Sequence, residues 1–425
     1  MSSNKILSAA CLVLASPAIF ASGFALIEQS ASGQGLSYAG AAANAEDASI
    51  MWFNPAGLSE LNVSQTVVGG HFISPHAAFT NDGSEIANAG GLNGPITGSD
   101  DNGSTVGFVP NLYWKGEVSG HDIGLGINVP FGQHISYDPT WVGRYHATQT
   151  NLKALNINSA VSKSVGEKLK FGFGLNAQHV DLEMQNKVDN RLAGDFVSGD
   201  GNAKLTASSW AFGYNFGLLY KPAESTNLGL SYRSSITHFA SGYADYTNVT
   251  NAGALTNVVD ATLESTVTVP GSASLSLNHA MNPKFQLLAD ATWTQWSDYK
   301  ELVIDFHSLQ ADGNTRQDFK DSWRVSLGGI YQLNKSLKLR AGVAFDQTPV
   351  SDPKNRSPRT PDGDRKWLSA GLGYKLTPNI NLDLAYSHLY AEEGAVNYTT
   401  NDVQYLIGSY DADINIFSAQ LVWKY

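Results

Sequence analysis

Alternation of apolar and polar side chains with a period of two is the main pattern of the chain beyond residue 60. In the segment 322–333, Val325 and Leu327 share one face, and Arg324 and Ser326 share the other. Because successive side chains of a β-strand point to opposite sides, this pattern predicts strands with lipid or a core on one side and water or polar packing on the other. The same alternation recurs in three further segments, 169–178, 337–346 and 380–387.

Short connections alternate with long polar ones between these strands. The short connections fall near 116–121, 166–168, 221–226, 281–284, 333–336 and 377–379. The long ones fall near 81–103, 132–150, 184–206, 242–260, 298–318, 349–365 and 391–410. This rhythm is typical of a transmembrane antiparallel β-barrel, which has tight periplasmic turns and longer outer loops, and it gives about fourteen strands. A soluble β-sandwich, the alternative all-β fold, would show no such rhythm.

The two ends of the chain indicate where the barrel resides. Residues 1–21 have the features of a signal peptide, with Lys5 ahead of an apolar run and small residues at its end. The last strand alternates up to the aromatic Tyr425, which resembles the signal by which the barrel-assembly machinery recognises outer-membrane proteins. No later stretch reaches the roughly 18 unbroken apolar residues of a membrane helix. We therefore expect the outer membrane of a Gram-negative bacterium.

Composition narrows the possible functions. Charged residues make up 15% of the chain, against about 25% in a typical soluble domain. The net charge of −11 argues against nucleic acid as a partner; acidic loops that keep the exposed end soluble explain it, and a specific cation site is the alternative. The single cysteine, Cys11, lies in the segment expected to be removed, so we expect neither cysteine catalysis nor a thiolate metal site.

Residues 22–60 do not follow the strand pattern. They are rich in Ala, Gly and Ser and are too few to bury a core of their own. We therefore predict a small, mostly helical hatch that packs against or inside the barrel, with the barrel itself formed by residues 61–425.

Ordered motifs in this chain resemble those of the FadL-type long-chain fatty acid transporters. In the hatch they are Gly23-Phe24, Gly33 with Gly35, Tyr38-Ala39-Gly40, Glu46-Asp47 and Asn54-Pro55-Ala56. Later stretches that match are GLGINVPFG (124–132), SYRSSITH (231–238), DFKDSWRVSLGG (318–329), LRAGVAFDQTPV (339–350) and RTPDGDRKWLSAGLGY (359–374). The matches keep their order over essentially the whole mature chain.

The resemblance implies a fourteen-stranded barrel plugged by the hatch. We expect it to lie among outer-membrane lipid and lipopolysaccharide, and as a monomer, because nothing in the sequence suggests an oligomer. Long-chain fatty acids would be caught in an outer groove, pass to an internal pocket near the plug, and leave sideways through a gap at the third strand. Such a carrier needs apolar surfaces, because each buried CH₂ contributes about 0.8 kcal/mol. Aromatic or alkane hydrocarbons are the alternative substrates. No cofactor is implied.

The third expected strand, 123–131, contains Pro130, followed by Phe131 and Gly132. Proline donates no hydrogen bond to a neighbouring strand, and glycine tolerates a bend. Unpaired backbone groups at membrane depth are tolerated only beside an opening or a polar interior. These residues are therefore predicted to form a lateral gate; the alternative is that Pro130 merely ends the strand at the extracellular rim.

The resemblance also assigns roles to single residues. Phe24 and Asn54 match hatch residues near the bound ligand, and the alternatives are plug packing for Phe24 and a plain turn for Asn54. Asp321 and Arg365 match an acid and a base required for transport, which are expected to form an interior pair. However, Asp321 is two residues before Trp323 and would share its outward face in a regular strand. An inward position for Asp321 therefore requires a bulge or a location at the rim.

A carboxylate head needs a cation in the binding pocket, whereas a hydrocarbon needs none. Lys187 and Arg316 are the cations expected to bind it. Two functions of other classes compete with fatty acid uptake. An outer-membrane enzyme is disfavoured because the ten histidines are scattered, with no GxSxG, HExxH or metal-type spacing. A general porin is disfavoured by the hatch.

Overall fold

The computed structural model describes residues 23–425, so the expected signal peptide lies outside the described residues. The chain forms a closed antiparallel barrel of fourteen transmembrane strands, which confirms the predicted fold class. Some of these strands are interrupted and are made of two segments each, namely β9 with β10, β11 with β12, β13 with β14, and β15 with β16. The first and last strands pair antiparallel, from Gln65 opposite Lys424 to Asn81 opposite Gly408, and this closes the cylinder.

The strand bounds are β1 (Gln65–Asn81), β2 (Glu85–Ile86), β3 (Gly94–Pro95), β4 (Gly107–Val118), β5 (His121–Ser136), β6 (Gln149–Val165), β7 (Leu169–Val188), β8 (Gly201–Ala223), β9 (Thr226–Arg233), β10 (Ile236–Thr247), β11 (Ala261–Val269), β12 (Ser272–Asn282), β13 (Phe285–Thr294), β14 (Glu301–Phe306), β15 (Gly313–Arg316), β16 (Ser322–Gln332), β17 (Leu337–Asp346), β18 (Arg365–Thr377), β19 (Ile380–Ala391), β20 (Gly394–Tyr398) and β21 (Gln404–Lys424). The helices are short: α1 (Ala31–Gln34), α2 (Ile50–Phe53), η1 (Pro55–Glu60), η2 (Gly90–Leu92), η3 (Asn190–Ala193), η4 (Gly253–Leu255) and η5 (Trp296–Asp298).

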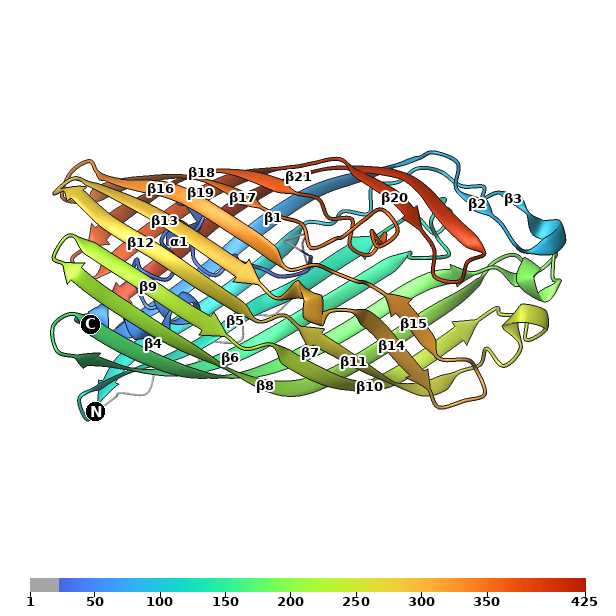
Figure 1. Ribbon diagram of the computed structural model, residues 1–425, viewed down its shortest axis with the longest axis horizontal. Helices are drawn as coiled ribbons and strands as arrows, with labels where there is room; N and C mark the ends of the chain where they lie inside the picture. The colour runs from blue at the N-terminus through green and yellow to red at the C-terminus, as the bar shows by residue number, and fades with distance from the viewer. Residues whose placement is uncertain (1–22) are drawn as a thin grey trace, which may run out of the picture.

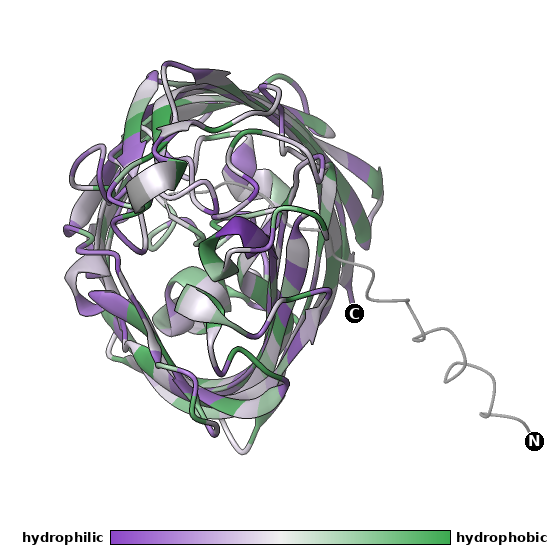
Figure 2. Ribbon diagram, turned by 90° about the vertical axis from the view of Figure 1, so that its right-hand side faces the viewer, coloured by the Kyte–Doolittle hydropathy of each residue, from purple (hydrophilic) through white to green (hydrophobic). Residues whose placement is uncertain are grey.

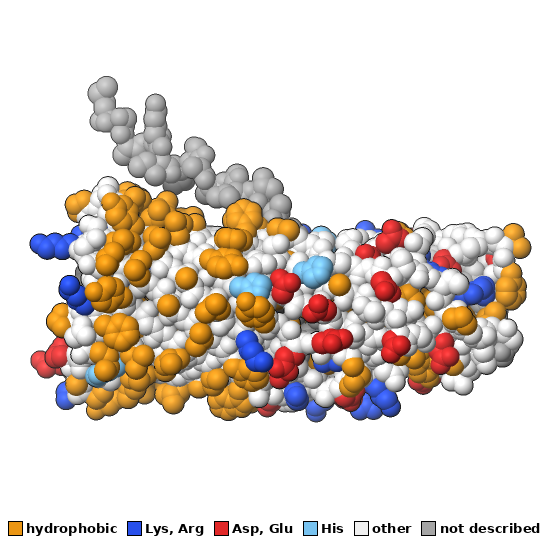
Figure 3. Space-filling model, turned by 90° about the horizontal axis from the view of Figure 1, so that it is seen from above, with side chains coloured by type: hydrophobic (Ala, Val, Ile, Leu, Met, Phe, Trp, Pro, Cys, Tyr) orange, Lys and Arg blue, Asp and Glu red, His pale blue; other side chains and the backbone are white. Residues whose placement is uncertain are grey.

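The two ends of the cylinder differ as the connection lengths predict. Tight turns gather at the end where the C-terminus lies, and long connections with β2, β3 and β15 extend toward the other end (Figure 1). On the face seen in Figure 3, hydrophobic side chains cover the tight-turn half, and acidic and basic side chains gather over the other half. Large apolar side chains near the tight turns, such as Phe171 of β7 and Phe216 of β8, are 48% and 49% exposed. An apolar band of this kind faces lipid in outer-membrane barrels.

Helices do not supply the membrane contact. Within residues 23–425, no helix combines the length and the apolar character that crossing a bilayer demands. The hatch helices α1, α2 and η1 instead contact the strands of the barrel wall. The view along the barrel shows ribbon segments that cross its interior (Figure 2).

The described part of the hatch, residues 23–60, packs against glycines on the inner wall of the barrel. A Cβ atom added to Gly217 of β8 would overlap the side-chain oxygen of Asn54, and one added to Gly172 of β7 would overlap the backbone of Ala56. Glycines elsewhere in the wall meet the hatch backbone in the same way: Gly229 at Ala42, Gly342 at Leu36 and Gly371 at Gly35. The absence of side chains here lets two backbones touch, so the hatch fits the lumen closely.

A larger side chain at Gly217 should therefore displace the hatch. We expect Gly217→Leu to cost about 1–3 kcal/mol through overpacking, and to convert a barrel with little steady current into a conducting one in planar bilayers. Gly91→Leu is the matched control, because a Cβ at Gly91 meets open space. Unchanged conductance in Gly217→Leu, with the barrel folded, would contradict this account of the plug.

Candidate functional site

The wall of the barrel is interrupted between β4 and β5. These strands pair regularly only from Val118 opposite His121 to Leu112 opposite Ile127. Beyond Ile127, β5 continues to pair with β6 on its other side, with a register shift between Asn128 and Phe131. One interpretation of the sequence was that Pro130 ends the strand at the extracellular rim. That interpretation is wrong, because β5 continues beyond Pro130 to Ser136.

The first residues of the hatch hydrogen-bond to this interrupted edge. The backbone nitrogen of Leu26 donates to the carbonyl of Pro130 at 2.7 Å, and the nitrogen of Gly132 donates to the carbonyl of Phe24 at 3.0 Å. Ala25 and Phe131 thereby form an isolated antiparallel bridge. The segment 24–26 thus takes the place of the missing neighbouring strand and satisfies backbone groups that would otherwise be unpaired at membrane depth.

Two cavities lie on either side of this N-terminal segment. The inner cavity, of about 150 Å³, lies between the hatch and the wall. The outer cavity, of about 610 Å³, lies toward the long loops. Residues that line the inner cavity include Leu26, Phe53, Pro130, Phe131, Arg233 and Trp367. Residues that line the outer cavity include Phe24, Leu152, Val180, Met184, Leu302 and Arg359. Both linings are mainly apolar with a few polar groups, as is typical of small-molecule sites.

Phe24 forms an aromatic cluster at the boundary between the two cavities. Its ring lies 4.9 Å from that of Trp296 in an edge-on contact, 5.3 Å from that of Tyr299 and 6.0 Å from that of Phe131. Phe24 lines the outer cavity, whereas the next residue, Ala25, lines the inner one. The cluster therefore lies where the linings of the two cavities meet.

Arg233 brings an uncompensated cation to the inner cavity. Its guanidinium donates to Oδ1 of Asn176 at 2.8 Å and to the carbonyl of Trp52 at 2.5 Å, and it stacks 3.5 Å from the centre of the Trp52 ring. No carboxylate of the described chain forms an ion pair with it. Burying a guanidinium without an opposite charge costs several kcal/mol of stability. A bound anion would offset part of this cost, so Arg233 is suited to contact an anionic ligand.

Arg359 has the same character at the outer cavity. It donates to the carbonyl of Gln149 at 2.8 Å and to Oγ1 of Thr150 at 2.7 Å, and it has no ion-pair partner among residues 23–425. Burial lowers the pKa of Arg359 to about 10, so it remains charged at neutral pH. Each cavity is therefore lined by one arginine that forms no ion pair with a carboxylate of the described chain.

The structure does not place the cations expected from the sequence in either cavity. Lys187 donates to Oδ1 of Asn202 at 2.6 Å and lines neither cavity. The Arg316 side chain is 77% exposed and pairs with Asp318 at 2.8 Å. Both are already paired with neighbours, so the structure gives no support to their role as head-group ligands, which stays a prediction. Arg233 was missed, although it stands in the stretch 231–238 that carried the resemblance.

The expected pair of Asp321 and Arg365 is not formed. Arg365 is fully buried and contacts Asp346 at 3.1 Å and Asp362 at 3.5 Å. Asp346 lies directly opposite Arg365 in the register of β17 and β18, whereas Asp321 accepts a hydrogen bond from the backbone of Ser297. Cross-strand register, rather than motif membership, decides this pairing.

Asn54 has a structural role in the hatch. Its side chain accepts a hydrogen bond from the nitrogen of Ala56, which caps η1, and donates to the carbonyls of Ala42 at 2.7 Å and Leu218 at 3.0 Å. It lines neither cavity. The hatch turn and the wall therefore meet at this residue, and a contact with ligand remains a prediction.

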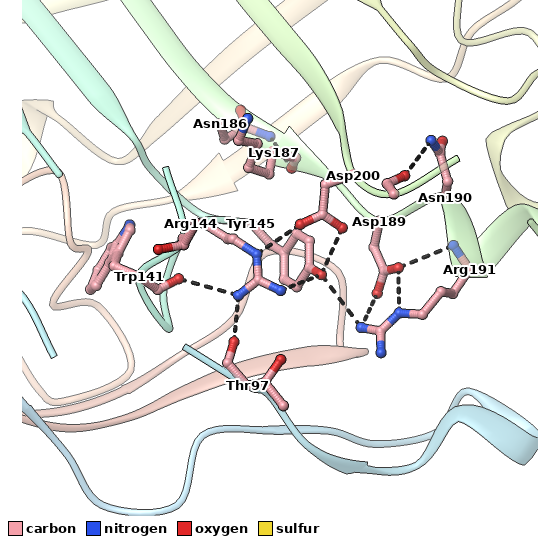
Figure 4. A network of polar contacts seen from close by, with 12 residues as sticks. Thr97, Trp141, Arg144, Tyr145, Asn186, Lys187, Asp189, Asn190, Arg191 and Asp200 are labelled. Carbon is pink, nitrogen blue, oxygen red and sulfur yellow. Dashed lines mark hydrogen bonds and ion pairs between the residues drawn. The ribbon is translucent and has the colours of Figure 1, made fainter. Parts of the chain in front are cut away.

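Charged side chains connect the loops at the mouth of the outer cavity. Arg144 pairs with Asp200 at 2.8 Å and donates to the carbonyl of Thr97 at 2.6 Å. Tyr145, which lines the cavity, donates to Asp200 at 3.0 Å, and Arg191 approaches the Tyr145 hydroxyl at 3.4 Å (Figure 4). Three connections distant in sequence are thus held together, and this fixes the shape of the entrance.

Glu28 of the hatch is a buried acid with an unpaired oxygen. It is 1% exposed, and its Oε2 atom has no hydrogen-bond partner. Burial raises the pKa of Glu28 to about 7, although the nearby Arg365 opposes that rise.

This acid should make the attachment of the hatch sensitive to pH. A carboxyl whose pKa is raised by folding stabilises the folded state at low pH, and this stability is lost as pH rises from about 4.5 to about 7. Between pH 5 and pH 8 we expect the denaturant midpoint of unfolding to fall, and Glu28→Gln to abolish that decrease. The control Glu117→Gln, at the exposed end of β4, should keep the decrease. An equal decrease in Glu28→Gln would contradict the assignment.

Comparison with known proteins agrees with this architecture. The model of the family described as "Outer membrane protein transport protein (OMPP1/FadL/TodX)" matches residues 12–425. Outer membrane protein P1 of Haemophilus influenzae is 31% identical over 419 residues, which cover 91% of this chain and 90% of that protein. The long-chain fatty acid transport protein of Escherichia coli (strain K12) is 26% identical, with 93% of each chain covered.

Two solved structures share the fold. A Pseudomonas aeruginosa FadL homologue has a TM-score of 0.85 at 22% identity, with 94% of this chain and 99% of that chain covered. The Pseudomonas putida toluene transporter TodX has a TM-score of 0.71 at 17% identity, with 95% and 100% covered. These comparisons confirm the predicted family and the predicted location in the outer membrane. The chain belongs to the OMPP1/FadL/TodX family of outer-membrane transport proteins for hydrophobic compounds.

Proposed function

We propose that this protein takes up long-chain fatty acids, and that Arg359 and then Arg233 bind the carboxylate head during passage. The observation that carries the proposal is the Arg233 guanidinium, which lines an apolar cavity and has no acid partner among the described residues. A carboxylate supplies the missing charge, and a charge-assisted hydrogen bond to it is short and strong. A toluene molecule would leave this cation unpaired.

The acyl chain finds its environment in the outer cavity. Val180, Leu182 and Met184 of β7 and Leu205 of β8 line it, together with Ile304 of β14. Each methylene moved from water to such a lining contributes about 0.8 kcal/mol. The apolar lining holds the chain, and Arg359 at its edge holds the head.

Exit through the wall at β5 is the second part of the proposal. The hydrogen bonds from Leu26 to Pro130 and from Gly132 to Phe24 cover the interrupted edge. When a ligand displaces segment 24–26, these bonds break and the inner cavity opens between β4 and β5 toward the lipid. Pro130 keeps the edge free of a regular neighbour, because proline has no backbone N–H to donate.

Aromatic hydrocarbons remain the second candidate substrate. The cluster of Phe24, Phe131, Trp296 and Tyr299 offers edge-on contacts that suit a flat ring. The related TodX is described as a toluene transporter.

Substitution of Arg233 separates the two substrates. A hydrogen bond to a charged group contributes about 1.5–3 kcal/mol, so Arg233→Gln should lower oleate uptake by about tenfold or more and leave toluene uptake unchanged. Uptake is measured with labelled substrates in a host that lacks its own transporter. Arg316→Gln, which removes an exposed cation, is the control and should leave both rates unchanged. Equal uptake of oleate by Arg233→Gln and the unmodified protein would exclude Arg233 as the head-group ligand.

A reversible cross-link tests the exit. Ala25 and Phe131 form the non-hydrogen-bonded pair of their bridge, in which side chains lie close. The double variant A25C/F131C should form a disulfide that fixes segment 24–26, stops uptake under oxidising conditions and restores it on reduction. The single variant A25C should be unaffected. Normal uptake by the fully cross-linked protein would show that the segment need not move.

A further inference from the structure

A polar pocket of about 240 Å³ opens at the tight-turn, periplasmic mouth of the barrel, beside the hatch. The hatch contributes Glu46 and Asp47 to its lining. Four lysines complete it, one from the turn between β16 and β17 and one each from β17, β18 and β21. We call it the lysine pocket after these residues, Lys335, Lys338, Lys375 and Lys424.

The lysines of β18 and β21 point into the mouth of the barrel rather than toward lipid. Lys375 follows Tyr374, and Lys424 follows Trp423; these aromatic residues face outward and are 44% and 51% exposed. Because side chains alternate along a strand, both lysines lie on the inner face. The pocket is therefore open to the periplasm and is separate from the substrate cavities.

The acids near the pocket already have partners. Glu46 pairs with Lys338 at 2.9 Å and with Arg340 at 2.5 Å, and Asp383 pairs with the same Arg340 at 2.8 Å. Asp47 accepts hydrogen bonds from hatch and wall groups. These carboxylates have little capacity left for additional cations.

Three of the four lysines have no such partner. Within the part of the chain that the structure describes, the amines of Lys335, Lys375 and Lys424 form no ion pair and no side-chain hydrogen bond. The chain as a whole carries a net charge of −11, so a concentration of unpaired cations here is not a consequence of composition. Like charges brought together repel one another unless an anion lies between them.

We propose that the lysine pocket binds a phosphate-bearing anion from the periplasmic side. A phosphate group carries more negative charge than one carboxylate and accepts several hydrogen bonds, which matches three free ammonium groups around one pocket. A soluble phosphate ester and a phospholipid head group that reaches over the rim present the same chemistry. A bound phosphate would lie beside Glu46 and compete with it for Lys338, and so would loosen one attachment of the hatch.

The test measures binding to the full mature protein in nanodiscs. Inorganic pyrophosphate is titrated calorimetrically in phosphatidylcholine discs, and retention of phosphatidylglycerol against phosphatidylcholine is measured by native mass spectrometry. We expect saturable binding in at least one arm, and a decrease of about tenfold or more in K335Q/K375Q/K424Q, since several charge-assisted hydrogen bonds are lost. The variant K335R/K375R/K424R keeps the charges and should keep binding.

A matched control removes three other lysines near the tight-turn end of the barrel, one from β6 and two from turns. K163Q/K168Q/K284Q changes the net charge equally, and these side chains are exposed outside the pocket. Pyrophosphate binding that depends on the pocket identifies a soluble ligand, and phosphatidylglycerol retention alone identifies a lipid ligand; both support the proposal. Binding in neither arm, or an equal loss in the control variant, would overturn it.

Discussion

Every backbone N–H and C=O group at membrane depth needs a hydrogen-bond partner, and this requirement shapes the whole molecule. Closure of β1 on β21 satisfies it around most of the wall. Between β4 and β5 the strands no longer supply partners, and the backbone of Phe24 and Leu26 supplies them instead. The start of the hatch is thus both a structural replacement for a strand and the cover of a potential opening.

The same hatch is held in two physically different ways. Wall glycines such as Gly172 and Gly217 let the hatch backbone approach the strands closely, and this attachment is van der Waals packing. Glu46, by contrast, pairs with Lys338 and Arg340, which are held by the barrel. Close packing gives a plug its fit, whereas ion pairs respond to competing charges.

The buried arginines of the interior fall into two groups according to whether they have carboxylate partners. Arg365 and Arg340 lie between carboxylates and stabilise the wall and the hatch. Arg233 and Arg359 have only neutral acceptors, and each lines an apolar cavity. An unpaired buried charge costs stability, which is consistent with a function that requires it. Family membership is established by the comparisons, and the two unpaired arginines carry the case for a carboxylate substrate.

The sequence by itself determined the barrel, its orientation and its plug, because alternation, connection length and terminal signals are local properties of the chain. It also indicated the break at Pro130, since proline lacks the N–H that a strand ladder requires. Only the tertiary structure decided which charges meet. Arg365 pairs with Asp346 rather than Asp321, and Lys187 and Arg316 lie outside the cavities that Arg359 and Arg233 line. These outcomes depend on register between strands and on residues far apart in sequence, which no local pattern specifies.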